Sequence, residues 1–389
     1  MPSYIRSNSN RFYAAIEPSY AVAAQVTSSN RFAATLLRAQ QMIEKPRRLD
    51  KTGTRTRITA NPDGRRRTGF ELSSYLSTWD TSGQLPYGPF FQAALGAVPE
   101  IGERMTVAAV SGPVTFTTQS PHGRTIGSAV SDGREIRFVT ATGNAYQLTV
   151  NTPFSDALVS GTPLNTTITY RLATQLPSIS IYDYWNPSTA LSRIILGAAV
   201  DVMKISVTGD QHEFTFAGPA ADLVDSVTFS DGNAGLNSFP IEPDLMPSNS
   251  GAVPGHLGQA WLGGTANRFF TLTEANIQLI NNIELRNQEF GFCWPRSTTP
   301  GMRQVNTSFS LFAQDDTQTL ALYTAAKQLD TISIMLQMGK QKGQLMGVYL
   351  PSVEPVLPAF DDSETRLRWT FQNNLAGGTS DDELYIAFA

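Results

Sequence analysis

The sequence predicts a mainly β fold with few helices, built from two similar sheet-plus-helix domains and a small all-β insertion. The chain has 389 residues, enough for two or three domains with buried cores. Its 30 Gly and 23 Pro, together with many Thr, Ser and Asn, favour short strands joined by turns. One order of elements, β–β–α–β–β–β, also occurs in both halves once residues 101–175 are set aside.

The first half begins with a polar stretch, residues 1–50, which we interpret as an extended arm with one helical patch at 32–38. From residue 55 onward a hairpin is predicted across residues 61–64, whose Asn-Pro-Asp-Gly sequence is a strong turn signal. Residues 89–96 predict a short helix, because Pro stands at its first position and Gly ends it.

Residues 101–175 contain evenly spaced Thr/Val-rich strands and no helix signal, so we expect a small all-β module there. A strand at 178–185 and a hairpin turning at 208–211 follow. The Gly-, Pro- and Asn-rich residues 231–267 lack periodicity, and we interpret them as a linker. The predicted organisation is an N-terminal basic arm (1–52), a first domain (53–100 and 176–230), the inserted module (101–175), the linker (231–267) and a second domain (268–389).

In the second domain, residues 302–337 predict a strand, a turn, a helix and another strand. Residues 304–311 alternate with the period of two expected of a strand that has one buried face. Asp315 and Asp316 can cap the helix, because carboxylates accept hydrogen bonds from first-turn amides. Leu322, Ala326 and Leu329 share one helical face. The polar positions of the strand are Gln304, Asn306, Ser308 and Ser310.

The two halves correspond segment by segment in the same order. The common order, with the helix in the same slot, favours a duplication; the alternative is two unrelated β-rich domains. The matched segments start at Arg65 and Met302, at Pro89 and Thr319, at Leu176 and Thr331, at Leu196 and Met346, and at Gln211 and Arg366.

Charge is distributed unevenly along the chain. Residues 1–70 carry 13 Lys or Arg against 4 Asp or Glu, an excess of +9. The other 319 residues carry 16 against 29, or −13. A basic arm on an acidic body could bind nucleic acid, dock onto the acidic body of a neighbouring copy, or stay a solvated flexible arm.

Motifs for catalysis and for metal or cofactor binding are missing from the sequence. His122, His212 and His256 are widely separated, and Cys293 is the single cysteine, so neither a metal site nor an intrachain disulfide is predicted. There is no phosphate-binding loop, no dinucleotide-binding glycine motif and no G-x-S-x-G. No apolar run approaches the roughly 20 residues that span a bilayer, and no signal peptide is expected. We therefore expect a protein that is not an enzyme and that folds in a reducing cytoplasm.

The final third of the sequence contains, in this order, the segments IQLINNIELRNQEFGFCWPRSTTPGMRQVNTSFSLFAQDD, LALYTAAKQ, GQLMGVYLPSV, DDSETRLRWTF and TSDDELYIAFA. They resemble the tail tube proteins of long-tailed bacteriophages, the major tail proteins that stack into a hollow DNA conduit. In the first half, GFELSSYLS and PFFQAALGA resemble the matching elements. The resemblance covers most of residues 53–100 and 176–389.

This resemblance implies two fused β-sandwich or partial-barrel domains, each flanked by a helix, whose sheets join those of neighbouring subunits into an inner barrel. Two-domain members form trimers with pseudo-sixfold symmetry, so a homotrimeric ring is implied. The implied location is the virion tail, assembled in the cytoplasm of the bacterial host. The implied partners are further copies of the chain and the tape measure, tail terminator and distal tail proteins, without a membrane. Double-stranded DNA would pass through the lumen without specific binding.

The resemblance also implies roles for two groups of side chains. The four polar residues of the 304–310 strand are expected to face the channel. A lumen that passes DNA should repel phosphate, which an acidic body would do. The basic segment is then expected to be an inter-ring arm, in which Arg65, Arg66 and Arg67 contact an acidic face of the next ring. The module at 101–175 is expected to decorate the outer surface.

Other functions stay open. One is a carbohydrate- or receptor-binding virion protein in which the all-β insertion carries the binding. Another is a tail cap or baseplate component, which would form one ring and never stack. A hydrolase on a β scaffold lacks the nucleophile and metal signatures that it would need.

Overall fold

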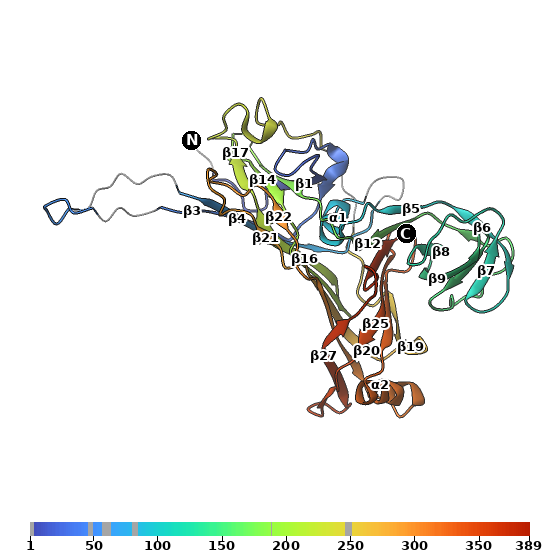
Figure 1. Cartoon of the computed structure of the whole chain (residues 1–389). Helices are drawn as coiled ribbons and strands as arrows, with labels where there is room; N and C mark the ends of the chain where they lie inside the picture. Colours follow the sequence, from blue (N-terminus) through green and yellow to red (C-terminus); the bar gives the residue numbers. More distant parts are fainter. Residues whose placement is uncertain (1–3, 46–49, 57–63, 80–84, 188, 246–250) are drawn as a thin grey trace.

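The computed structural model describes residues 4–45, 50–56, 64–79, 85–187, 189–245 and 251–389 (Figure 1). Strands dominate these residues, which contain two α-helices, α1 (Gly88–Leu95) and α2 (Thr317–Gln328). The predicted mainly β class with few helices is confirmed. Most of the predicted hairpin turn at 61–64 lies outside the described residues.

One series of elements occurs twice along the chain, and we call the two copies the first and second repeat (Figure 1). The first repeat consists of β1 (Asn10–Ile16), β2 (Arg31–Phe32), β3 (Leu36–Ile43), β4 (Arg66–Tyr75), α1, β13 (Ile179–Trp185), β14 (Arg193–Ala198), β15 (Val202–Thr208), β16 (His212–Ala220) and β17 (Asp222–Asp225). The second consists of β18 (Gly258–Gly263), β19 (Asn267–Phe269), β20 (Leu272–Ile280), β23 (Gln304–Phe312), α2, β24 (Ile332–Met338), β25 (Met346–Glu354), β26 (Ala359–Asp361), β27 (Arg368–Ala376) and β28 (Tyr385–Phe388).

The strand pairings of the two repeats match one for one. An outer sheet β2–β1–β13–β14–β17 corresponds to β19–β18–β24–β25–β28. An inner sheet β3–β4–β16–β15 corresponds to β20–β23–β27–β26. Even a register shift recurs, between Ile179 and Ile181 in one repeat and between Ile332 and Ile334 in the other. The predicted duplication is therefore present in the fold.

Two of the matched segments also correspond residue by residue. Tyr75 lies opposite Glu213 in the first repeat, and Phe312 lies opposite Arg368 in the second. Since these pairs occupy the same place, Arg65 aligns with Met302 and Gln211 with Arg366, as the sequence comparison predicted. The predicted match of Leu196 with Met346 is wrong, because Ile195 and Leu350 follow the common register shift, so Leu196 aligns with Pro351.

The first repeat begins inside the stretch that was predicted as an arm. The helical patch at 32–38 is wrong, because β2 and β3 occupy this region. Its Ala, Leu, Arg and Gln residues favour helices in isolation, but pairing along the whole of β3 with β4 outweighs that propensity. Residues 50–56 lie beyond the ends of β3 and β4, away from the body (Figure 1).

The predicted linker at 231–267 also contains structure. Within it, β18 pairs with β24 over six residues, and β19 starts at its end. The glycines of this stretch indicate a loop, whereas the pairing of β18 with β24, a strand some 75 residues away, cannot be predicted from the neighbouring residues. The domain boundaries themselves stay predictions.

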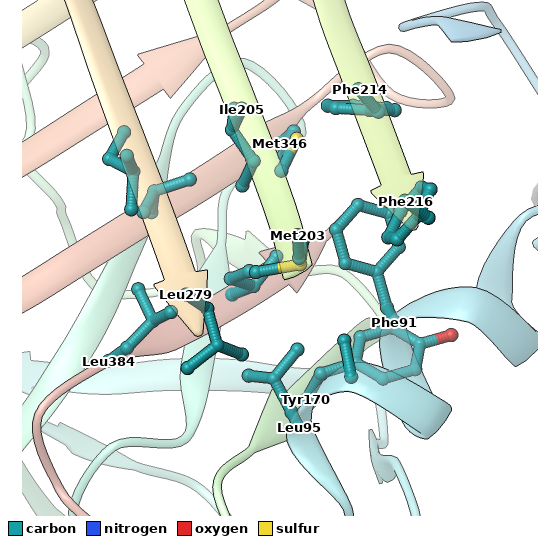
Figure 2. Close-up of a cluster of buried hydrophobic side chains, with 14 of the residues drawn as sticks. Phe91, Leu95, Tyr170, Met203, Ile205, Phe214, Phe216, Leu279, Met346 and Leu384 are labelled. Carbon is teal, nitrogen blue, oxygen red and sulfur yellow. The ribbon is translucent and has the colours of Figure 1, made fainter. Parts of the chain in front are cut away.

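Aromatic side chains fill the core beneath the inner sheet of the first repeat (Figure 2). Phe91 and Leu95 point from α1 toward β15, β16 and β20, and the Phe91 ring lies 5.3 Å from the rings of both Phe214 and Phe216. Pro89 in the first turn and Gly96, with φ of 102°, delimit this helix as predicted. Burial of these large rings stabilises the fold, at about 25 cal/mol per Å² of apolar surface.

In the second repeat, Asp316 caps α2, since its Oδ1 accepts a hydrogen bond of 2.6 Å from the amide of Thr319. Leu322 and Ala326 are buried on the predicted face. Leu329 is exposed instead, because it ends the helix in the left-handed conformation with φ of 62°. Within the loop between β20 and β23, a short pair forms, β21 (Glu284–Leu285) with β22 (Thr298–Thr299).

Residues 105–164 form a small all-β module with its own apolar core, around Phe116 and Leu148. A bridge between Ser131 and Asn165 connects its two outermost strands, so the sheet curls on itself. The order of strands is β11 (Pro163–Leu164), β6 (Met105–Val110), β7 (Thr115–Thr118), β10 (Gln147–Val150), β9 (Ile136–Asn144) and β8 (Ala129–Ser131). Two flanking strands, β5 (Glu100–Gly102) and β12 (Thr167–Arg171), pair with each other, and β12 also pairs with β28.

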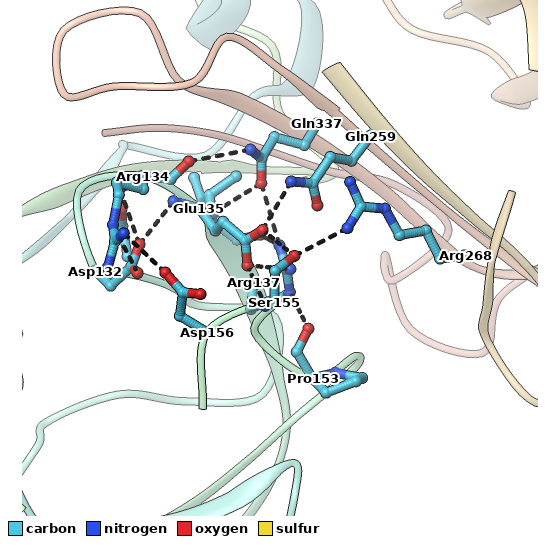
Figure 3. A network of polar contacts seen from close by, with 12 residues as sticks. Asp132, Arg134, Glu135, Arg137, Pro153, Ser155, Asp156, Gln259, Arg268 and Gln337 are labelled. Carbon is cyan, nitrogen blue, oxygen red and sulfur yellow. Dashed lines mark hydrogen bonds and ion pairs between the residues drawn. The ribbon is translucent and has the colours of Figure 1, made fainter. Parts of the chain in front are cut away.

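The module is fixed to the second repeat by a buried polar network (Figure 3). Arg137 on β9 is fully buried, and its guanidinium lies 4.2 Å from the centre of the Trp261 ring. It donates to Glu135 Oε2 at 2.6 Å and to Gln337 Oε1 at 3.1 Å. Gln259 Nε2 donates to the other oxygen of Glu135 at 2.7 Å. Because Gln259 and Gln337 belong to β18 and β24, the network joins two parts that are distant in sequence.

Opposing effects set the pKa values in this network. Burial lowers the pKa of Arg137 to about 10, although Glu135 acts against the shift, so the guanidinium stays charged at neutral pH. Burial alone would raise the pKa of Glu135, but the charge of Arg137 and hydrogen bonds from Ser155 outweigh it and hold that pKa below its usual value. The module is therefore attached through a compensated pair of buried charges.

Candidate functional site

The inner sheets of the two repeats join into a run of eight strands, β3–β4–β16–β15–β20–β23–β27–β26, within a larger sheet of fifteen strands in which β25 also pairs with one end of β27. We call this run the eight-stranded sheet. The joint is the pairing of β15 with β20, which runs antiparallel over seven residue pairs, from Val202 opposite Ile280 to Thr208 opposite Glu274. We call this pairing the repeat junction. A full-length strand pairing makes the two repeats one continuous wall.

One face of the eight-stranded sheet is polar, while the other covers the apolar core. The period of two along each strand places hydroxyl and amide side chains in rows across the strands. In one such row, Ser206 of β15 lies opposite Asn276 of β20, which lies opposite Ser308 of β23. We call this surface the polar face.

All four predicted channel residues lie on the polar face. Gln304 is exposed, and Asn306 and Ser308 are half-buried. Ser310 is buried and donates to Glu274 Oε1 at 3.0 Å. Their position on this face follows from the pairing register, whereas their role as channel lining stays a prediction.

The polar face carries charges of both signs, and three ion pairs lie on it. Arg368 contacts Glu274 at 2.5 Å, Arg38 contacts Glu71 at 3.7 Å, and Arg67 contacts Glu44 at 3.2 Å. The excess of acidic residues in the body is thus not concentrated here. A near-neutral surface of amides and hydroxyls offers phosphate groups neither a strong attraction nor a strong repulsion.

The three predicted arm arginines lie beside the loop between β20 and β23. Arg65 Nη2 donates to the carbonyl of Gln288 at 3.2 Å, and the amide of Arg66 donates to the carbonyl of Cys293 at 2.8 Å. Arg67 pairs with Glu44. This loop is the second-repeat counterpart of the loop between β3 and β4, so the two loops leave the same end of the sheet side by side. The predicted inter-ring role of the arginines stays untested.

The two outermost strands of the eight-stranded sheet, β3 and β26, are the counterparts of the two strands that meet at the repeat junction. Phe360 on β26 is 57% exposed, whereas its counterpart Ile205 at the junction is fully buried. Nearby Leu357 is 44% exposed, and Met42 on β3 is 64% exposed. We call these strands the free edges. The free edges cannot be recognised from the sequence, because the same alternation appears in a paired strand and in an unpaired one.

A cavity of about 250 Å³ lies at one end of the repeat junction, between the turn after β15 and the β18–β19 hairpin. His212 lines it and is 1% exposed, and neither ring nitrogen forms a hydrogen bond within the described part of the chain. Burial lowers the pKa of His212 to about 4. Among the described residues, no group of three or more His, Cys, Asp or Glu side chains is placed to hold a metal ion.

Acid should destabilise the fold through His212. Its pKa in the folded state lies below the usual value near 6.5, so as the pH falls from 6.5 toward 4 only the unfolded chain takes up the proton. The folded state therefore loses up to about 3 kcal/mol of stability as the pH falls through this window, because each unit of pKa difference corresponds to about 1.36 kcal/mol. His212→Leu should remove this component, as measured by urea unfolding at pH 7 and pH 5. The exposed His256→Leu is the control; equal pH dependence in both variants would contradict the assignment.

Comparison with known proteins gives a distant structural likeness. No family model and no curated protein sequence matches the chain. The chain is similar to a solved structure of the SPP1 tail tube, obtained by solid-state NMR and cryo-electron microscopy, with 12% identity and a TM-score of 0.27. The match covers 33% of this chain and 81% of that one. A score this low does not define a common fold, so function has to be inferred from the geometry of the chain itself. No helix among the described residues is long and apolar enough to cross a membrane.

Proposed function

We propose that the chain is a structural subunit of a phage tail tube. Copies would join edge to edge into a ring whose polar face lines a channel, and rings would stack into a tube. The observation that carries this proposal is the repeat junction, together with its unpaired counterparts at the two ends of the same sheet. Unpaired edges of this kind are an aggregation hazard in an isolated protein, and a self-limiting assembly removes it.

The geometry of such an assembly follows from the duplication. The junction joins two different edges, and a contact between different surfaces repeats until it closes into a ring or continues as a helix. The apolar face is already covered by the helices and outer sheets, so only the polar face is free to border an open channel. With three chains, about 24 strands at about 4.8 Å would give a barrel about 37 Å across before strand tilt, which leaves room for a DNA duplex.

Location, partners and the absence of an activity belong to the same proposal. The protein would reside in the virion tail after assembly in the bacterial cytoplasm, without enzymatic activity. Its partners would be its own copies and the tape measure, tail terminator and distal tail proteins. Double-stranded DNA would pass without specific binding, which the polar face supports because Arg38, Arg67 and Arg368 on it are each paired with a glutamate.

Charge at the two ends of the eight-stranded sheet supports stacking. Arg65, Arg66 and Arg67 lie at one end, at the start of β4, and residues 44–67 hold nine Lys or Arg against three Asp or Glu. Exposed carboxylates gather at the opposite end, beside the two ends of α2 and in the turn after β26. They include Asp315, Asp330, Asp361, Asp362 and Glu364.

Reversing the arm charges should weaken stacking without preventing ring formation. Replacing Arg65, Arg66 and Arg67 by Glu changes the net charge of this end by −6, so it would repel the acidic end of the next ring. The loss of stacking should be larger at low salt, where screening is weak. Tube length in electron micrographs at 50 mM and 500 mM salt measures the effect, with Arg104→Glu on the module side as the control. Tubes of unchanged length at both salt concentrations would contradict the inter-ring role.

The function itself is tested by sedimentation and electron microscopy of the purified full-length protein. Large assemblies with a central channel are expected. Single rings that never stack would indicate a cap or baseplate component. Monomers at every concentration would contradict the proposal, and cell or glycan binding by such monomers would favour the receptor-binding alternative.

A further inference from the structure

The second repeat carries an edge whose register can be matched to the repeat junction. Val353 lies opposite Ala376 and Asp361 opposite Arg368, so residues 353–354 and 359–361 pair with β27 in the same antiparallel register on either side of the unpaired residues 355–358. In the first repeat, β15 runs along β16 in the same way, with Ser206 opposite Glu213. Because Glu213 and Arg368 are counterparts, Asp361 takes the place of Ser206. By the same register, Ala359 takes the place of Lys204, and Leu357 that of Val202.

The other free edge can be matched in the same manner. Arg38 of β3 lies opposite Glu71, and Asn276 of β20 lies opposite Ser308. Glu71 and Ser308 are counterparts, so Arg38 takes the place of Asn276. It follows that Gln40 takes the place of Gln278, and Met42 that of Ile280.

We propose that a second copy of this chain pairs its β3 antiparallel with residues 357–361, with Met42 opposite Leu357, Gln40 opposite Ala359, and Arg38 opposite Asp361. This register repeats three pairs of the repeat junction, Val202 with Ile280, Lys204 with Gln278, and Ser206 with Asn276. The inference rests on the proposed function and adds to it the two edges and their register.

The side chains that this register brings together are complementary. Met42 and Leu357 are both exposed apolar residues in the single chain, and each would cover the other. Arg38 and Asp361 carry opposite charges, and the present partner of Arg38 is an exposed Glu71 at 3.7 Å. A shift by one residue would turn every side chain of the edge to the wrong face of the sheet.

The core side of the same edge gives a second line of support. In this register Phe360 lies opposite Ala39, where the repeat junction has Ile205 opposite Ile277. Both isoleucines are fully buried, whereas Phe360 is more than half exposed. A second copy would therefore cover Phe360 as the second repeat covers Ile205. Pro355 and Pro358 cannot donate ladder hydrogen bonds, which limits unspecific pairing of this edge by other strands.

Paired cysteines test the register directly. In a Cys293→Ser background, which has no other cysteine, Met42→Cys and Leu357→Cys would put two Cβ atoms about 4.5–5.5 Å apart across neighbouring copies. Mild oxidation should then link the chains, given that modest backbone adjustment brings this spacing within disulfide range. The matched control replaces Leu357→Cys by Val356→Cys, which lies on the opposite face. We expect at least tenfold more covalent multimer in the first protein than in the control, and a ladder that stops when the ring closes.

A charge exchange gives an independent readout. Arg38→Asp and Asp361→Arg should each weaken ring formation, and the double variant should regain it. Rings that form without the Met42–Leu357 link, or that link equally through Val356, would overturn the register while leaving the proposed function intact. If the Cys293→Ser parent forms neither rings nor tubes, both the register and the proposed function fail.

Discussion

Glu135→Ala is expected to lower the free energy of unfolding by about 3–5 kcal/mol, because it leaves the Arg137 guanidinium charged and buried without its carboxylate. Arg137 has no exposed surface from which water could replace that partner, and its remaining hydrogen-bond acceptors, which include the carbonyl of Pro153 and Gln337, are uncharged (Figure 3). Chemical unfolding monitored by tryptophan fluorescence measures the change. Since the network joins the module to β18 and β24, both should unfold at lower denaturant concentration.

Two further variants separate the lost charge pair from the lost packing. Glu135→Ala combined with Arg137→Met should recover much of the stability, because replacing a buried pair by apolar side chains of similar volume is often neutral. Arg134→Ala removes the exposed ion pair with Asp156 and should cost less than about 1 kcal/mol. A loss below about 1 kcal/mol for Glu135→Ala, or a double variant no more stable than the single one, would contradict the role given to this pair.

Phe360→Asp is expected to abolish association of the chains while the monomer stays folded. The side chain is 57% exposed in the single chain, so a carboxylate there remains hydrated. In an assembled ring the same position would be covered, which forfeits about 2 kcal/mol of apolar burial and leaves an unpaired charge that costs several more. Every 1.4 kcal/mol is a factor of ten, so association should weaken at least a hundredfold.

The control for this variant is Ile126→Asp on the module, where the side chain is also 57% exposed but far from both free edges. It should assemble like the parent protein. Sedimentation velocity across a concentration series measures association, and circular dichroism with urea unfolding shows whether each monomer is folded. Phe360 stacks on Trp369 at 5.1 Å, so the variant monomer should lose about 1 kcal/mol. Unchanged assembly of Phe360→Asp would exclude β26 as an interface.

Local features of the fold could be predicted wherever the evidence lies within a few residues. The period of two in β23, the Pro and Gly that delimit α1, and the turn at 208–211 all depend on neighbours in sequence. The order of elements also revealed the duplication. By contrast, β3 has a helix-favouring composition, and β18 is rich in glycine. Both are strands because of pairings that no local pattern shows.

The same distinction applies to the candidate site: its local features could be predicted from the sequence, and its long-range contacts could not. The alternation in β23 placed four polar side chains on one face, and the pairing register agrees with that prediction. The free edges were not foreseen, because whether Phe360 is covered depends on which strand lies beside β26. Likewise, the contact of Arg137 with Gln337 spans 200 residues of sequence, and an isolated Arg in a Thr/Val-rich strand gives no sign of it.

A cryo-electron microscopy reconstruction of the purified full-length protein tests the central claim most directly. The proposal predicts a closed ring of three chains in which six repeats surround a channel, with Gln304, Asn306 and Ser308 on its inner wall and the module outside. A ring that places the polar face outward, or an assembly in which β3 and β26 of neighbouring copies do not meet, would contradict it.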